Sequence, residues 1–159
     1  MRNRVPLALA VLATVGLAAC STVATLNTDS MTALKELRAV HETRADLFAK
    51  KDAAAVAAQH APTLMATLAD GTRLDRAGFE ALLAKKMQET SAPPAAHIDW
   101  LSQEGTGYVA IVSPGLDGQG TVLRETWVKT SDGWKLKAIE ALTEESAIAF
   151  KKGERKQSS

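Results

Sequence analysis

Apolar residues follow three different patterns along the chain. From Val5 to Gly16 they are almost continuous, and further on they recur every three or four positions. The recurrent spacing is typical of helices with one buried face, and it predicts helices over 29–50, 53–60 and 75–89. A short strand is expected at 63–68, and four more at roughly 96–103, 107–113, 121–130 and 134–144. Helices therefore come first, and a run of strands follows.

Residues that favour caps and turns separate these elements. Asp29 or Ser30, Asp52 and Asp75 each stand where a side chain can cap the next helix. The last four strands are joined by connections that are too short for parallel crossovers, so they must pair with antiparallel neighbours. The sequence predicts an α+β fold, in which three N-terminal helices pack on one face of a curved, mainly antiparallel sheet.

This order of elements resembles the nuclear transport factor two-like superfamily. The similarity lies in Lys51-Asp52 before the second helix, in Asp70-Gly71 before the third, and in a closing hairpin over 124–137 that turns at Ser131-Asp132-Gly133-Trp134. It covers residues 30–145 and is closest in type to small bacterial members related to ketosteroid isomerases and polyketide cyclases. The resemblance implies a strongly curved sheet and a cone-shaped cavity. That fold hosts isomerases, dehydratases, cyclases and non-catalytic binding proteins, so the fold alone does not choose a function.

The first twenty residues follow the pattern of an export signal. Arg2 and Arg4 precede the apolar run, and Leu17-Ala18-Ala19-Cys20 ends it. This ending resembles the lipobox of bacterial lipoproteins, which implies cleavage before Cys20 and lipidation of its thiol. The run is shorter than the ~20 residues that span a bilayer. An ordinary cleaved signal is the remaining alternative.

The signal hypothesis sets the domain boundaries. Residues 1–19 are the signal peptide, 20–29 the lipidated cysteine and its tether, 30–145 the folded domain, and 146–159 a polar, mobile tail. Lipidation predicts a membrane partner through the anchor and a place in the cell envelope. By resemblance, Ser21 after the cysteine implies the periplasmic face of the outer membrane if the cell has two membranes.

Composition excludes several classes of function. Loss of Arg2 and Arg4 with the signal changes the formal net charge from +1 to −1, and no basic stripe is present outside the tail, so nucleic acid is not expected as a partner. The single cysteine excludes an internal disulfide and any zinc site built from several thiolates.

The closing hairpin supplies the first candidate site. A three-residue turn over 131–133 would pair Thr130 with Trp134 and Arg124 with Glu140. This register turns Trp134, Arg124 and Glu140 inward. The charged pair is then either a polar floor of the cavity, able to accept a proton or clamp an anion, or a structural cross-strand ion pair.

His41 is the other cavity candidate. It falls on the apolar stripe of the first helix, where it is either an acid or base facing the cavity or a core histidine satisfied by one hydrogen bond.

The same register turns Trp127, Leu123 and Ile139 outward. These residues are either a partner surface, through which the protein could form a homodimer, or ordinary cross-strand packing.

Other chemistry is weakly represented. His97 and Asp99 share a strand face but lack a third ligand, so no metal and no cofactor are predicted. The position of His60 is explained by the end of the second helix, where the helix dipole favours a positively charged side chain. The first helix contains no tyrosine, which prevents the residue set of ketosteroid isomerases from being carried over.

Three functions remain open. The leading hypothesis is a lipid-anchored, non-catalytic domain that binds a small molecule in its cavity or a protein on its sheet. The alternative is an enzyme of isomerase, cyclase or dehydratase type that uses Glu140 or His41 as acid or base. The third is a structural accessory whose cavity is filled by its own side chains.

Overall fold

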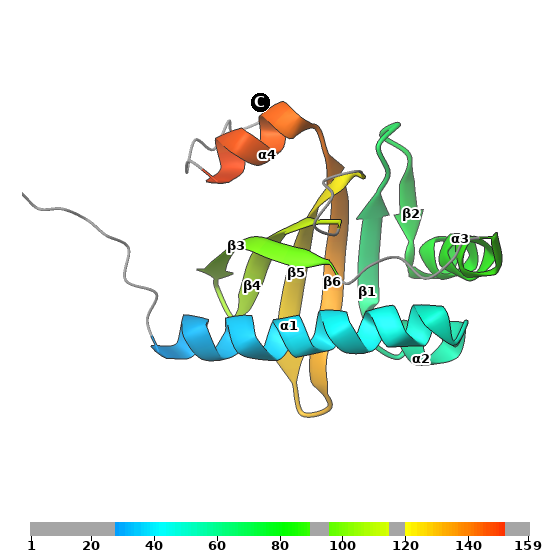
Figure 1. Ribbon diagram of the computed structural model, residues 1–159, viewed down its shortest axis with the longest axis horizontal. Helices are drawn as coiled ribbons and strands as arrows, with labels where there is room; N and C mark the ends of the chain where they lie inside the picture. Colours follow the sequence, from blue (N-terminus) through cyan, green and yellow to red (C-terminus); the bar gives the residue numbers. More distant parts are fainter. Residues whose placement is uncertain (1–27, 90–95, 115–119, 152–159) are drawn as a thin grey trace, which may run out of the picture.

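The computed structural model describes residues 28–89, 96–114 and 120–151. The elements, in chain order, are α1 (Thr28–Ala49), α2 (Ala53–Ala57), β1 (His60–Thr67), β2 (Arg73–Asp75), α3 (Arg76–Glu89), β3 (His97–Glu104), β4 (Gly107–Ser113), β5 (Val122–Thr130), β6 (Gly133–Leu142) and α4 (Glu144–Lys151). Figure 1 shows α1 crossing the strands, α3 beside β1 and β2, and α4 at the far end of β6.

All six strands belong to one sheet, in the order β2-β1-β6-β5-β4-β3. Strands β3 to β6 form an antiparallel meander, as their short connections predict. β1 pairs with β2 in antiparallel fashion and joins β6 in parallel, which the sequence pattern did not predict. The predicted fold class is confirmed: the protein is α+β with a curved, mostly antiparallel sheet. The sheet is curved but not closed (Figure 1).

Aspartate side chains cap the N-terminal ends of α2 and α3. The Asp52 carboxylate accepts a hydrogen bond from the Ala55 amide at 3.0 Å, and Asp75 accepts one from the Gly78 amide at 2.8 Å. Both caps satisfy backbone donors that the first turn of a helix leaves free. The predicted end of α2 is wrong, because the helix stops at Ala57 and His60 opens β1 instead.

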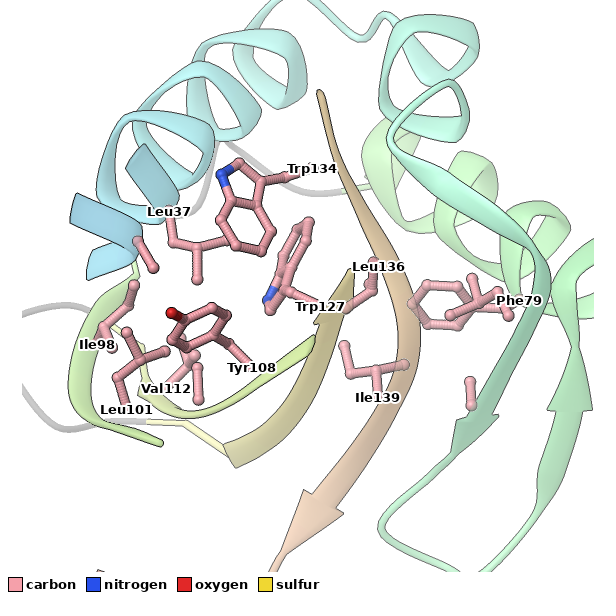
Figure 2. Packing of buried hydrophobic residues seen from close by; sticks show 14 residues of the cluster. Leu37, Phe79, Ile98, Leu101, Tyr108, Val112, Trp127, Trp134, Leu136 and Ile139 are labelled. Atoms are coloured by element: carbon pink, nitrogen blue, oxygen red, sulfur yellow. The ribbon is translucent and has the colours of Figure 1, made fainter. Parts of the chain in front are cut away.

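The core lies between α1 and the concave side of the sheet. Leu37 from α1 meets Trp134, Trp127 and Tyr108 from the meander, as Figure 2 shows. Trp127 and Leu37 have no exposed surface. Further members extend the same cluster toward α3: Ala33, Leu64, Ala66, Phe79, Ile98, Leu101, Ala110, Val112, Leu136 and Ile139.

The β5–β6 hairpin differs from its predicted register near the turn. Gly133, at φ +102°, pairs with Thr130 instead of lying in the loop, so Lys129 faces Trp134 and Trp127 faces Leu136. A β-bulge then follows, in which Lys137 has no partner on β5. Beyond the bulge the predicted pairs, including Arg124 with Glu140, do form. An extra residue in one strand exchanges the faces of every residue after it.

The C-terminal segment contains more structure than its polar composition predicts. The expected tail began at residue 146, but α4 extends to Lys151 and buries Ala147, which is 4% exposed, while Ile148 is exposed. The helix begins at Glu144, where the Thr143 hydroxyl accepts a hydrogen bond from the Ser146 amide at 3.2 Å. The predicted signal, the part of the predicted tether over 20–27, and the last residues, 152–159, lie outside the described part of the chain. The last two residues of the predicted tether, Thr28 and Asp29, belong to α1 instead.

We expect Leu136→Ala to lower the free energy of unfolding by about 2–5 kcal/mol, because it leaves a cavity in a close-packed core. Leu136 has no exposed surface and lies at the centre of the sheet. The matched control is Met65→Ala on β1, whose side chain is 50% exposed, and it should change stability by no more than about 0.5 kcal/mol. Urea denaturation followed by circular dichroism measures both. An equal loss of unfolding free energy in Leu136→Ala and Met65→Ala would contradict the placement of Leu136 in the core.

Candidate functional site

A cavity of about 330 Å³ opens between α1, α3 and the strands β4, β5 and β6. Its polar residues are His41, Arg44 and Glu125. The rest of the wall is largely apolar: Ala45, Phe48, Phe79, Leu83, Ala96, Val112, Pro114, Thr121, Leu123 and Ile139. An apolar hollow with a few convergent polar groups is the usual form of a small-molecule site, and this volume is near the lower end of such sites.

His41 and Glu125 form the buried polar centre of this cavity. The exposed fractions are 5% for His41 and 3% for Glu125. His41 Nε2 lies 3.1 Å from Glu125 Oε2, an ion-pair distance, but its orientation does not give a directed hydrogen bond to any described residue. The Trp127 indole Nε1 donates a hydrogen bond of 2.8 Å to the same carboxylate oxygen, and its ring meets the His41 ring edge-on at 5.7 Å between centroids.

Glu125 is held in its charged form although it is buried. Burial by itself raises the pKa of this carboxyl group, but His41, the charge of Arg44 and the Trp127 hydrogen bond together outweigh burial and lower the pKa below its usual value. The cavity wall therefore carries a negative charge at Glu125, which is stabilised by His41 and Arg44 on α1 and by Trp127 on β5.

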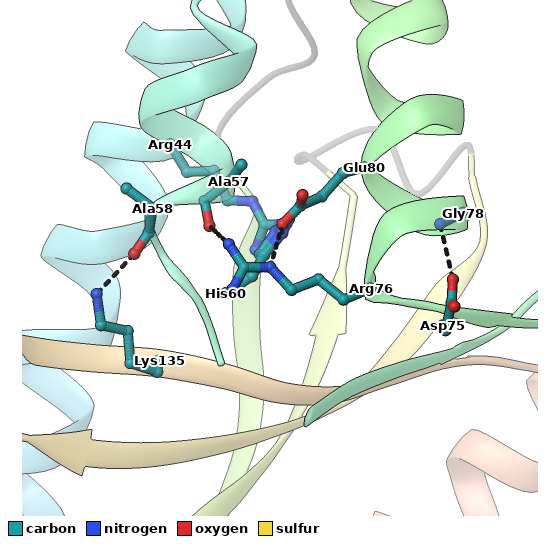
Figure 3. Close-up of polar contacts among 9 residues, drawn as sticks. All are labelled: Arg44, Ala57, Ala58, His60, Asp75, Arg76, Gly78, Glu80 and Lys135. Atoms are coloured by element: carbon teal, nitrogen blue, oxygen red, sulfur yellow. Dashed lines mark hydrogen bonds and ion pairs between the residues drawn. The ribbon is translucent and has the colours of Figure 1, made fainter. Parts of the chain in front are cut away.

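A second set of polar contacts begins at Arg44 and leads to the protein surface. The Arg44 guanidinium donates to His60 Nε2 at 3.3 Å, and His60 Nδ1 lies 3.1 Å from Glu80 Oε1. Arg76 completes the set, because its Nε donates to the same Glu80 oxygen at 2.6 Å (Figure 3). These contacts connect the end of α1 to β1 and α3.

The two neighbours of His60 define its tautomer. Arginine can only donate, so His60 Nε2 must accept and carries no proton, while Nδ1–H donates to the Glu80 carboxylate. Burial, followed by the charge of Arg44, lowers the pKa of His60, although Glu80 acts in the opposite direction. His60 is thus a neutral histidine that joins a cation to a carboxylate.

Two of the predicted cavity residues lie on the other face of the sheet. Arg124 and Glu140 pair across β5 and β6 as predicted, but both alternate with residues that line the cavity, so they face away from it. Arg124 lies 3.7 Å from Glu104 on β3. Trp134 does face inward, where its Nε1 donates to Glu36 on α1 at 2.7 Å, but it is not part of the cavity wall.

The three residues predicted to face outward instead face inward. Trp127 is fully buried, Ile139 is 9% exposed, and Leu123 packs against the core. Leu123 and Ile139 line the cavity. The face assignment was wrong for two reasons. Gly133 pairs across the turn, which shifts the register of β5 by one residue, and the bulge at Lys137 reverses the alternation in β6.

Of the predicted site residues, only His41 is placed in the cavity by the structure as expected. The sequence reasoning missed Arg44, Glu125 and His60. Arg44 comes three residues after His41 on the helix, so a shared face was a detectable signal. Glu125 and His60 had no such signal, because their positions depend on the hairpin register and on the parallel pairing of β1 with β6.

The possible metal half-site is an exposed local cluster. His97 Nδ1 lies 3.0 Å from Asp99 Oδ1, and the Ser113 hydroxyl donates to the other Asp99 oxygen. Within residues 28–89, 96–114 and 120–151 no three histidine, cysteine or acidic side chains gather to hold a metal ion. Among these same residues, no helix combines the length and apolar character needed to cross a membrane.

Comparison with known proteins identifies the fold. No protein-family model matches the chain, and no curated protein matches it in sequence. A solved structure from Silicibacter pomeroyi, described as an NTF-2 like protein of unknown function, is similar at 17% identity with a TM-score of 0.56, over 70% of this chain and 95% of that one. An NTF2-like protein with a cystatin-like fold from Novosphingobium aromaticivorans is similar at 20% identity with a TM-score of 0.49, over 85% and 97% of the two chains. The protein thus has the nuclear transport factor two-like fold, as its sequence predicts.

The neutral state of His60 makes stability depend on pH. Its pKa is lower in the folded protein than the ordinary value of 6.5, so the unfolded chain takes up the proton first as the pH falls. The contribution of His60 is complete above pH 6.5 and is lost progressively below it. We expect Tm to fall between pH 7.5 and 5 in the native protein, and less steeply in His60→Gln.

Calorimetric melting at half-unit pH steps measures the two slopes. All other ionisable residues are the same in the two proteins, so the difference between the slopes reports His60 and the groups that contact it, Arg44 and Glu80. Parallel slopes would show that His60 has the same proton affinity in the folded and unfolded chains.

Proposed function

We propose that this protein is a lipid-anchored domain of the cell envelope that binds a small molecule in the cavity between α1, α3 and the sheet. One observation carries the proposal: a cavity of about 330 Å³ has a largely apolar wall on which three buried polar side chains, His41, Arg44 and Glu125, converge. An apolar hollow with a few convergent polar groups is the usual form of a small-molecule site. The remaining wall is apolar, which suits a ligand with one polar end.

The burial pattern favours the cavity over the sheet as the binding surface. The hypothesis of a partner surface rested on Trp127, Leu123 and Ile139, whose side chains contribute to the core and the cavity instead. Arg124 and Glu140 are the residues that occupy the opposite face at the same strand positions. Val109 and Ile111, which pair with Thr126 and Arg124, share that opposite face and have no exposed surface. The partner surface predicted from Trp127, Leu123 and Ile139 is therefore not available on the sheet.

An acid–base enzyme is the second candidate function, and the His41–Glu125 pair is the observation that favours it. A carboxylate beside one ring nitrogen orients an imidazole and stabilises its protonated form, and the other nitrogen is then available to a ligand. Nε2 is the ring nitrogen beside Glu125, so Nδ1 is the second nitrogen of this histidine at the cavity wall. In this version His41 is the base and Glu125 positions it. Glu140, the other base considered from the sequence, faces away from the cavity.

Filling the cavity should abolish binding. We expect the protein extracted from cell membranes to release a small molecule on denaturation, and Ala45→Trp to lack it, because Ala45 lines the cavity. Ala39→Trp, on the exposed side of the same helix, is the matched control and should retain the molecule. Native mass spectrometry before and after denaturation measures the mass difference. Retention by Ala45→Trp would place the molecule elsewhere, and its absence from the native protein would argue against a tightly bound ligand.

The anchor is tested separately from the cavity. The basic start, the apolar run and Leu17-Ala18-Ala19-Cys20 support lipidation at Cys20. We expect the native protein to sediment with membranes and to incorporate radiolabelled palmitate, and Cys20→Ser to lose both properties, because several acyl chains together anchor a protein stably. A Cys20→Ser protein that still sediments with membranes and is labelled would contradict lipidation at this residue.

A further inference from the structure

We propose that the ligand of the cavity is a small amphiphile with one carboxylate, whose head binds the Arg44 guanidinium and whose apolar body lies along the cavity wall. The inference deepens the function proposed above and depends on it. It rests on the position of Arg44, which neither the fold nor the comparisons assign to a ligand.

Arg44 is a buried cation without a counter-ion in direct contact. Its exposed fraction is 8%, and it lines the cavity. Its one hydrogen bond to a described residue goes to neutral His60, and no carboxylate of the described residues lies within 4.0 Å of it. A guanidinium has five N–H donors, and a buried charge is costly unless it is paired and hydrogen-bonded.

The nearby acids are already occupied by other partners. Glu125 Oε2 accepts from Trp127 and lies beside His41, so this carboxylate acts on Arg44 through its field and not through contact. Glu80 is bound by Arg76 and by His60. The contact that Arg44 lacks therefore has to come from outside the described residues.

A carboxylate is the chemical group that fits this gap. It can accept two parallel hydrogen bonds from one guanidinium, which is stronger and more directional than a single bond. Phe48, Phe79 and Ile139 lie on the same wall and offer apolar surface to the rest of the molecule. A cavity of about 330 Å³ restricts that body to a short chain or a single ring.

The test compares two ligands that differ only at the head, octanoate and 1-octanol, by calorimetric titration of residues 21–159 at pH 7.5. This piece retains every described element and the whole core. We expect octanoate to bind about tenfold or more tightly than octanol, since a charge-assisted pair replaces a neutral hydrogen bond. A pocket without an accessible cation would give the opposite order, because a carboxylate is costlier to desolvate than a hydroxyl group.

Substitutions then assign the effect to Arg44. Arg44→Met should remove the preference for octanoate, and Arg44→Lys should retain part of it because the charge remains. Arg38→Met on the exposed side of α1 is the matched control and should bind like the native protein. If the methionine variant does not fold, the order of the two ligands in the native protein and the lysine variant still decides the question.

Each other outcome overturns a different statement. Octanol bound as tightly as octanoate would overturn the carboxylate assignment and leave the cavity as a binding site. A preference for octanoate that survives Arg44→Met would overturn the role of Arg44. Failure of both ligands to bind would overturn this inference, whereas the small-molecule function is decided separately by the mass difference between the native protein and Ala45→Trp.

Discussion

The arrangement of the site depends on the buried carboxylate of Glu125. One oxygen of this group accepts a hydrogen bond from Trp127 on its own strand and lies beside His41 on α1, so it joins the longest helix to the centre of the sheet. Removing any one of these partners would leave a buried charge incompletely compensated, which is a large penalty in a packed core. The same contact fixes the distance between helix and sheet at the cavity and turns the His41 ring edge-on to the indole.

Polar contacts continue from the cavity toward the surface through His60. Arg44 lies at the cavity wall and Arg76 is partly exposed. Between them His60 and Glu80 form a chain in which each contact joins one donor to one acceptor. Such a chain holds α1, β1 and α3 in one arrangement, because a shift of any element would break a buried bond. It also keeps His60 neutral, so Arg44 lies at the cavity wall without a carboxylate in contact.

This division of roles gives the cavity two distinct polar groups. His41 faces a carboxylate and Arg44 faces a neutral ring, although the two residues are three positions apart on one helix. A histidine beside a carboxylate is suited to exchange a proton, whereas an arginine with unused donors is suited to hold an anion. A binding protein needs only the second property, and an enzyme acting on a small acid would use both.

The sequence by itself determined the fold class, the caps at Asp52 and Asp75, the meander and the position of His41, because these depend on local spacing and on connections too short for other topologies. It could not determine which face of the hairpin is buried. That depends on one glycine pairing across a turn and on the bulge at Lys137, whose location is decided by how β5 and β6 fit under α1. Only the tertiary structure therefore placed Glu125 inside and Glu140 outside, since a shift of one residue reverses every side chain beyond it.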